Sequence, residues 1–259
     1  MQNTSALYRR ILEDENHWFE AGVVIGESGN LITEQNERIL FGGVSIIVAR
    51  SGPDSGYLEN RLIRVRTASD MFKGRPEIGR AVAQEIEVQM FNPAGEFPPM
   101  SVVVPYVRAC TEQEQSEWLQ QGVFYIDTRS ITHNSNGLDI LTLHGFDAML
   151  TSERDYADTA LDWPAADTDV VAEIAGTMGV EVDPRTWNVM TDGYTLPLPA
   201  GYSLREMLEY IAMMYLGCFI MTETGQLRLV TLTELPPETN YLVDSFSNSL
   251  VFGEDRILV

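Results

Sequence analysis

The most constraining feature of this sequence is a series of short β-prone runs between Trp18 and Leu143, separated by Gly, Pro, Asn and Asp. Many short strands at such spacing are typical of a barrel or a sandwich. The turn residues agree, because Asn136-Gly137 is a strong hairpin dipeptide and is expected to join two antiparallel strands. The predicted strands are Phe19–Ile25, Gly43–Val48, Leu62–Arg66, Ala83–Met90, Val102–Ala109, Val123–Asp127 and Asp139–Leu143.

Helical periodicity occurs at the N-terminus and again after Asp155. Residues 5–13 are predicted to form a short amphipathic helix that Thr4 or Ser5 caps. A second helix is expected to start at a cap on Asp167 or Thr168 and to stop at Gly179. The apolar positions of these two helices are Leu7, Tyr8, Ile11 and Leu12, and Val170, Val171, Ile174 and Met178.

Two further helices and a hairpin are expected before residue 235. Asp183-Pro184 places a cap residue before proline, which predicts a brief helix over Arg185–Met190. Ser203 and Glu206 form a capping box at the start of a helix that runs to about Leu216 and ends at Gly217. Its buried stripe is predicted to be Leu204, Met207, Leu208, Ile211, Met214 and Tyr215. Strands Cys218–Thr222 and Leu227–Thr233 are expected to follow around a turn.

Composition indicates a folded protein that does not bind nucleic acid. The chain has 259 residues, 44% of them apolar, which is enough for a full core. It has no run of eighteen apolar residues and no signal-peptide pattern, so we expect neither export by a signal peptide nor a membrane span. The net charge of −21 opposes binding to phosphate, because that requires clustered Lys and Arg.

The soft ligands and reactive side chains are few. Cys110 and Cys218 lie in apolar surroundings and are expected to be buried free thiols. With three histidines and no ligand spacing, we expect no metal site and no cofactor. Residues 74–79 (GRPEIG) resemble a phosphate loop, but they lack the G-K-[ST] ending and are interpreted as a turn before the strand at Glu85.

No catalytic set is predicted. His144 and Asp147 could be a base and its orienting carboxylate. A histidine that ends a strand and an Asp that caps the next short helix explain the same residues structurally, and we favour that interpretation. The pairs Glu85 with Glu87 and Asp167 with Asp169 could be glycosidase carboxylates. Such pairs are also expected by chance in a chain with 38 acidic residues.

Residues Trp118–Leu150 resemble the tail-hub or tail-tip proteins of long-tailed bacteriophages and prophages. The resemblance extends over about Leu7 to Leu232 through five further segments. These are Ile78-Gly79, Glu85–Met90, Val104–Arg108, Trp163-Pro164 and Pro199–Ser203.

The resemblance implies a fold class and a domain organisation. It implies an α+β, β-rich protein with a barrel-like hub domain at 1–155, an α+β domain at 156–235 and the start of a further, truncated β domain at 236–259. Hub proteins of this type contain two related barrels, and Arg38–Val48 aligns with Ser249–Val259, with Phe-Gly, an Ile and a final Val in register. Chance similarity between apolar strands remains the alternative.

The function that the resemblance implies is structural. The chain would form a trimeric hub ring in a virion tail, assembled in the host cytoplasm, and would join a hexameric tube to the tip. Its partners would be other copies of itself, the tube or distal tail proteins and the tape-measure protein. DNA would pass through the ring without specific binding, and the acidity would either line that channel or serve solubility alone. Contacts are expected from exposed apolar or aromatic residues of the β-rich half such as Phe41, Tyr57, Phe72 and Phe97, and a role in the core is the alternative for each of them.

Two alternatives remain open at the level of sequence. The chain could be the hub portion of a cell-wall hydrolase whose catalytic domain lies beyond residue 259. It could also be the hub portion of a contractile injection-system spike.

Overall fold

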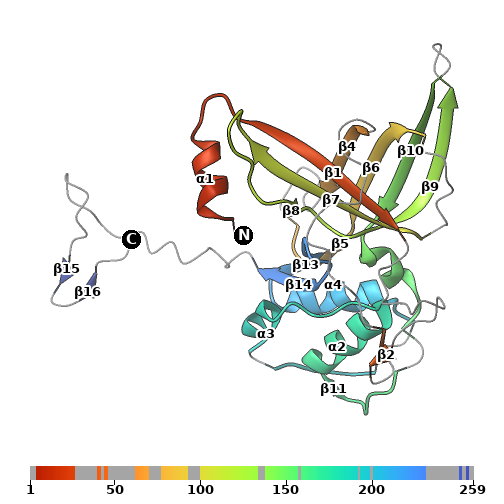
Figure 1. The fold of residues 1–259 in the computed structure, drawn as a ribbon. Helices are drawn as coiled ribbons and strands as arrows, with labels where there is room; N and C mark the ends of the chain where they lie inside the picture. The colour runs from red at the N-terminus through yellow and green to blue at the C-terminus, as the bar shows by residue number, and fades with distance from the viewer. Residues whose placement is uncertain are drawn as a thin grey trace.

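The α+β, strand-rich class expected from the sequence is confirmed by the computed structural model. The structure describes residues 4–26, 62–69, 77–92, 100–133, 138–156, 159–191, 193–198 and 201–231, together with two-residue strands at 40–41, 44–45, 251–252 and 255–256. Figure 1 shows a large twisted sheet on one side of the molecule and the helices of the second half on the other.

In the part of the chain that the structure describes, the large sheet has seven strands, all paired antiparallel. Its order is β1 (Trp18–Gly26), β7 (Val102–Cys110), β9 (Phe124–His133), β10 (Asp139–Phe146), β6 (Gln84–Phe91) and β4 (Leu62–Ser69), and β8 (Leu119–Gln120) also pairs with β7. Within the described residues the sheet is open, with β1 and β4 at its edges, so closure into a barrel stays a prediction.

One face of this sheet carries an apolar core, which explains why the predicted runs fold as strands. Alternate side chains of a strand point to opposite faces, and the buried set follows that period. Each predicted run coincides with a strand, although of Gly43–Val48 the structure describes only β3 (Val44–Ser45). The buried side chains of this cluster are Val23, Ile86, Val88, Met90, Val103, Phe124, Ile126, Leu141 and Leu143.

The hairpin predicted at Asn136-Gly137 joins β9 to β10. His133 pairs with Asp139 and the ladder continues to Tyr125 opposite Phe146. The turn residues themselves lie outside the described residues. The register shifts between His144 and Gly145, and a side chain on Gly145 would approach the carbonyl oxygen of Tyr125 to 2.3 Å. Glycine is therefore required at this bulge.

The N-terminal helix α1 (Ala6–Leu12) begins at the predicted cap. Ser5 Oγ accepts a hydrogen bond from the backbone amide of Tyr8, and Ile11 is the buried residue of the helix. Ser5 also donates from its amide and its hydroxyl to the carboxylate of Glu117, at 2.7 and 2.6 Å. These bonds fasten α1 to the loop that follows β7.

Helix α2 (Asp167–Met178) corrects one prediction. The residue at its N-cap is Ala166, with no side-chain cap, instead of Asp167 or Thr168. Asp167 is the first residue of the helix, and its carboxylate accepts from the amide of Thr168 at 2.8 Å and from Tyr215 Oη, far along the chain, at 2.5 Å. The predicted stop is confirmed, since Gly179 adopts a left-handed conformation with φ of 75°.

Helix α4 (Leu204–Met214) begins at its predicted cap, whereas the N-cap of α3 (Arg185–Val189) is Pro184 and not the predicted Asp183. Asp183 Oδ1 accepts from the amide of Arg185 at 2.9 Å, although Pro184 stands just before α3 and not inside it. The capping box of Ser203 and Glu206 is present in full. Helix α4 ends at Met214, earlier than the expected Leu216, because Leu216 has a positive φ of 52°.

A smaller sheet packs on α4 and joins the two halves of the chain. Its order is β14 (Leu227–Thr231), β13 (Gly217–Met221) and β5 (Arg80–Val82), and β5 runs parallel to β13. The second core therefore contains Ala81, Ala148 and Met149 from the first half. The predicted boundary at 155/156 stays a prediction, but residues on both sides of it share one core. Two short strands, β11 (Ala165–Ala166) and β12 (Thr195–Leu196), pair separately.

The two similar segments, Arg38–Val48 and Ser249–Val259, lie mostly outside the described residues. Strand β2 (Leu40–Phe41) pairs with β3 in the register Phe41 to Val44. Strand β15 (Val251–Phe252) pairs with β16 (Asp255–Arg256) in the corresponding register, Phe252 to Asp255. The predicted further domain at 236–259 is otherwise outside the described residues.

Candidate functional surfaces

The two residues that could suggest catalysis, His144 and Asp147, both contact neighbouring residues within the fold. Asp147 caps the 3-10 helix η1 (Ala148–Glu153), and its Oδ1 accepts from the amide of Met149 at 3.0 Å. His144 lies on β10 with Nε2 at 3.6 Å from Glu85 Oε2, and its ring makes an edge contact with Phe146. The predicted cap at Asp147 is confirmed, and His144 lies within β10, two residues before the strand ends.

Asp147 lies at the junction between the large sheet and α4. It is 1% exposed, and its Oδ2 accepts from the amide of Gln84 at 2.9 Å. Burial raises the pKa of this carboxyl to about 6, against the opposing effect of the two amides and of the Arg205 guanidinium. Gln84 Nε2 in turn donates to the carbonyl of Met221 at 2.8 Å. The sequence indicated the cap, whereas the burial follows from the fold.

Arg205 of α4 completes this junction. Its Nε donates to the carbonyl of Ala81 on β5 at 3.0 Å, and its guanidinium pairs with Glu153. Glu209, one turn later, accepts from the amide of Ala81 at 3.4 Å. Two side chains of α4 therefore bond to the backbone of β5, which fixes the helix against the strand.

The two acidic pairs lie on different elements, β6 and α2. Glu85 and Glu87 occupy alternate positions of β6, and Glu87 accepts from Gln89 at 3.2 Å. Asp167 is buried with Tyr215, whereas Asp169 is exposed on α2. The two members of the second pair thus face different environments.

The two thiols are buried in the fold, and the end of the glycine-containing segment 74–79 forms a backbone hydrogen bond with the start of β13. Cys110 and Cys218 are free and buried, as predicted. Burial, with the nearby Glu20 carboxylate, raises the pKa of the Cys110 thiol. Of residues 74–79 the structure describes Glu77 to Gly79, where the amide of Gly79 donates to the carbonyl of Gly217 at 2.7 Å. A strand follows this turn instead of a helix.

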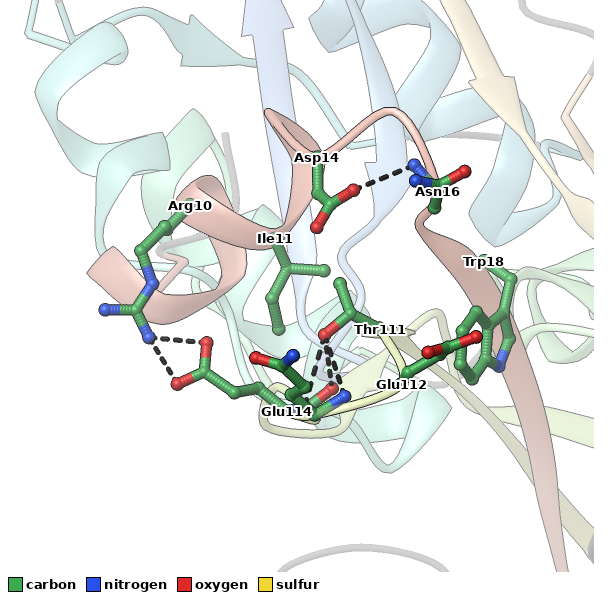
Figure 2. Close-up of a pocket in the computed structure, with 9 residues that line it drawn as sticks. Arg10, Ile11, Asp14, Asn16, Trp18, Thr111, Glu112 and Glu114 are labelled. Carbon is green, nitrogen blue, oxygen red and sulfur yellow. Dashed lines mark hydrogen bonds and ion pairs between the residues drawn. The ribbon is translucent and has the colours of Figure 1, made fainter.

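One hollow lies between α1, the start of β1 and the loop after β7. It has a volume of about 570 Å³. Figure 2 shows Arg10 and Glu114 at one side, joined by bonds of 2.7 and 2.6 Å, and Trp18 at the other. The lining is mostly polar or charged, and none of its residues is a histidine, cysteine or serine. The lining residues are Arg10, Ile11, Asp14, Asn16, Trp18, Thr111, Glu112, Gln113 and Glu114.

A smaller hollow of about 130 Å³ lies beside α4 and is mainly apolar. Sequence analysis missed it, because its walls come from segments that only the fold brings together. The lining residues are Leu196, Pro197, Leu198, Tyr202, Met207 and Tyr210.

The contact residues expected from the sequence cannot be placed against these hollows. Tyr57, Phe72 and Phe97 lie outside the described residues, and Phe41 is described only as part of β2. Over the described part of the chain, no group of three or more His, Cys, Asp or Glu is arranged to hold a metal ion. None of the helices in that part is both long enough and apolar enough to cross a membrane.

Comparison by sequence gives no assignment, since no family model matches the chain and no curated protein does. Several solved structures superpose on it. The 43 kDa tail protein of prophage MuSo2 from Shewanella oneidensis is 10% identical over 83% of this chain and 56% of its own, with a TM-score of 0.47. A tail protein from Neisseria meningitidis MC58 is 10% identical over 90% of this chain and 53% of its own, with a TM-score of 0.44.

A third superposition involves the Francisella PdpA-VgrG complex. The identity is 9% over 82% of this chain and 31% of that chain, with a TM-score of 0.43. The chain therefore spans about half the length of the two tail proteins and about a third of the chain from the complex. Proteins of phage or prophage tails are thus among the solved structures that this chain is similar to, at low identity.

Proposed function

We propose that this protein is a structural component of a phage or prophage tail tip. It forms a trimeric hub ring that joins the hexameric tail tube to the tip and surrounds the DNA exit channel. One observation carries the proposal. The segment with the strongest sequence resemblance, Trp118–Leu150, contains β8, β9, β10 and η1 in the expected order of strands, hairpin and short helix.

The partners in this proposal are proteins, and the location is the virion tail, assembled in the host cytoplasm. The chain contacts other copies of itself, the tube or distal tail proteins and the tape-measure protein. Three copies carry a formal charge of 3 × (−21) = −63. Because like charges at short range destabilise an interface, acidic side chains are expected away from subunit contacts and along the channel, where they repel DNA phosphates.

The structure of an assembled tail tests the ring. We expect three copies around the channel at the end of the tube, with Asp and Glu lining the lumen. A chain outside the ring, as a peripheral fibre, or a lumen lined mainly by Lys and Arg would reject the hub role. A surrounding sheath would instead indicate a contractile machine.

We also propose that the described residues do not catalyse a reaction. The support is that His144, Asp147, Glu87 and Asp167 all bond to neighbours within the fold. Purified protein is expected neither to clear peptidoglycan nor to release sugar ends. Hydrolysis that disappears in His144→Ala but persists in His133→Ala, a variant of an exposed histidine on β9, would overturn this proposal.

A further inference from the structure

Large apolar side chains gather on the exposed side of α4. Tyr210 and Met213 are three residues apart and therefore neighbours on the helix surface. Met213 packs over Gly79, since a Cβ there would lie 2.9 Å from the Cβ of Met213. We call this surface the apolar stripe, and its exposed members are Ile78, Leu198, Tyr202, Tyr210 and Met213. Single exposed apolar residues are ordinary, whereas a contiguous group indicates an interaction site.

The hollow at one end of the apolar stripe has the form of a socket. Its floor is formed by Leu196 and Met207, which are buried at 2% and 4% exposure. Its rim is formed by Leu198, Tyr202 and Tyr210, which are 60%, 49% and 51% exposed.

The size and the chemistry of the socket fit one apolar side chain. Its volume is about 130 Å³, and an apolar cavity of roughly 150 Å³ holds benzene. One leucine, methionine or phenylalanine side chain therefore fits. Tyrosine and methionine are enriched where proteins bind one another, and tyrosine is common among the residues that dominate binding.

The charge around the apolar stripe determines what kind of partner can approach. Ile78, one member of the stripe, is two residues from Arg80, whose guanidinium pairs with Glu77 and Glu209. The other four members lie within residues 155–231, which contain twelve acidic residues, three arginines and no lysine, a formal charge of 3 − 12 = −9. All three arginines are engaged within the fold. Arg185 pairs with Asp183, Arg205 pairs with Glu153, and the charge of Arg228 lowers the pKa of Asp183.

We propose that the apolar stripe docks a basic protein segment, which inserts one apolar side chain between Tyr202 and Tyr210 and surrounds it with Lys or Arg. A second copy of this chain is disfavoured as the occupant, because two such faces would bring like charges together. This docking site goes beyond the proposed hub ring and does not require the chain to be a trimer.

Selection from a random peptide library, with the whole purified chain as bait, tests the proposal. We expect the enriched peptides to share one Leu, Met or Phe flanked by Lys or Arg. Their affinity, measured by fluorescence anisotropy, should fall by roughly tenfold or more in Tyr210→Ser and in Leu198→Ser. It should also fall when salt rises from about 0.05 M to about 0.5 M, because the flanking contacts are ionic.

Phe19→Ser is the matched control, since Phe19 is an exposed aromatic residue on β1, away from the apolar stripe. It should leave the affinity unchanged. Leu198 and Tyr210 are exposed, so their replacement by serine is expected to leave the fold intact. Melting temperatures equal to that of the wild type would exclude a folding defect. Enrichment of acidic or uncharged peptides, no enrichment, or equal affinities in Tyr210→Ser and Phe19→Ser would each overturn the proposal. Self-association of the wild-type chain that Tyr210→Ser abolishes would show a second copy as the occupant and would also overturn it.

Discussion

Replacing Asp147 by asparagine should remove a pH dependence that this single carboxyl gives to the fold. Asp147 is buried at the junction of the large sheet with α4, and the pKa of its carboxyl is raised from 3.8 to about 6. Asparagine keeps an oxygen acceptor for the amide of Met149 but cannot ionise. It loses the acceptor for the amide of Gln84, a cost that does not vary with pH.

The sign follows from the raised pKa. Between about pH 4 and pH 6 the folded state holds a proton on Asp147 that the unfolded chain has lost, so stability falls as pH rises through this window. The full effect is the shift of about two pKa units at roughly 1.4 kcal/mol per unit, or about 3 kcal/mol. This loss of stability is complete above about pH 6, and it is absent below the ordinary pKa of the carboxyl, 3.8.

Urea unfolding of both proteins from pH 5 to pH 7 measures the effect while avoiding the isoelectric point near 4.3. Over this range the free energy of unfolding of Asp147→Asn, relative to wild type, should rise by about 1 kcal/mol. Other titrating groups cancel in the difference. Parallel stability curves for the two proteins across this range would refute a raised pKa at Asp147.

Three further predictions concern local geometry and burial. Gly145→Ala should lower the melting temperature strongly, because its Cβ would meet the carbonyl of Tyr125 at 2.3 Å, whereas Gly176→Ala in α2 meets nothing within 4 Å and should stabilise by about 0.5–1 kcal/mol. Ser203→Ala should cost about 1 kcal/mol in urea unfolding, and Ser203→Asp should restore most of it, because either side chain can cap α4. Cys110 and Cys218 should both resist a thiol reagent in the folded protein and react once it is unfolded, and rapid labelling of the native protein would contradict their burial.

Local signals explain which parts of the fold could be predicted. The capping box at Ser203 and the left-handed stop at Gly179 depend on neighbouring residues, and both were predicted correctly. The predicted cap of α2 was wrong, because the helix begins at Asp167 itself, whose carboxylate also accepts from Tyr215, a partner that the sequence does not reveal. Strand β5 was missed because it has three residues and its partner β13 lies more than a hundred residues later. Three residues are too few to show the alternation of apolar and polar side chains that identifies a strand, so the pairing of β5 depends on tertiary contacts.

The same limit applies to the candidate sites. In the sequence, nothing distinguishes Leu198, Tyr202 and Tyr210 from ordinary residues of a loop or a helix. They form the rim of a socket only because the fold packs the segment after β12 against α4. The contact residues chosen from the sequence were aromatic residues in the β-rich half. The socket lies in the other half, where exposure could not be read from helical periodicity alone.

The buried acids show why counting carboxylate pairs is a poor guide to function in this chain. Asp147, Asp167 and Asp183 are nearly inaccessible to solvent, and each has its own partners. The partners are two backbone amides for Asp147, a tyrosine hydroxyl and the Thr168 amide for Asp167, and the amide and guanidinium of Arg185 for Asp183. An isolated buried carboxylate is costly, so each of these side chains requires hydrogen-bond donors, which the fold supplies. The exposed acids carry the net charge instead. Carboxylates in this chain thus accept hydrogen bonds in the interior and make the surface acidic. Neither role requires two carboxylates at catalytic spacing.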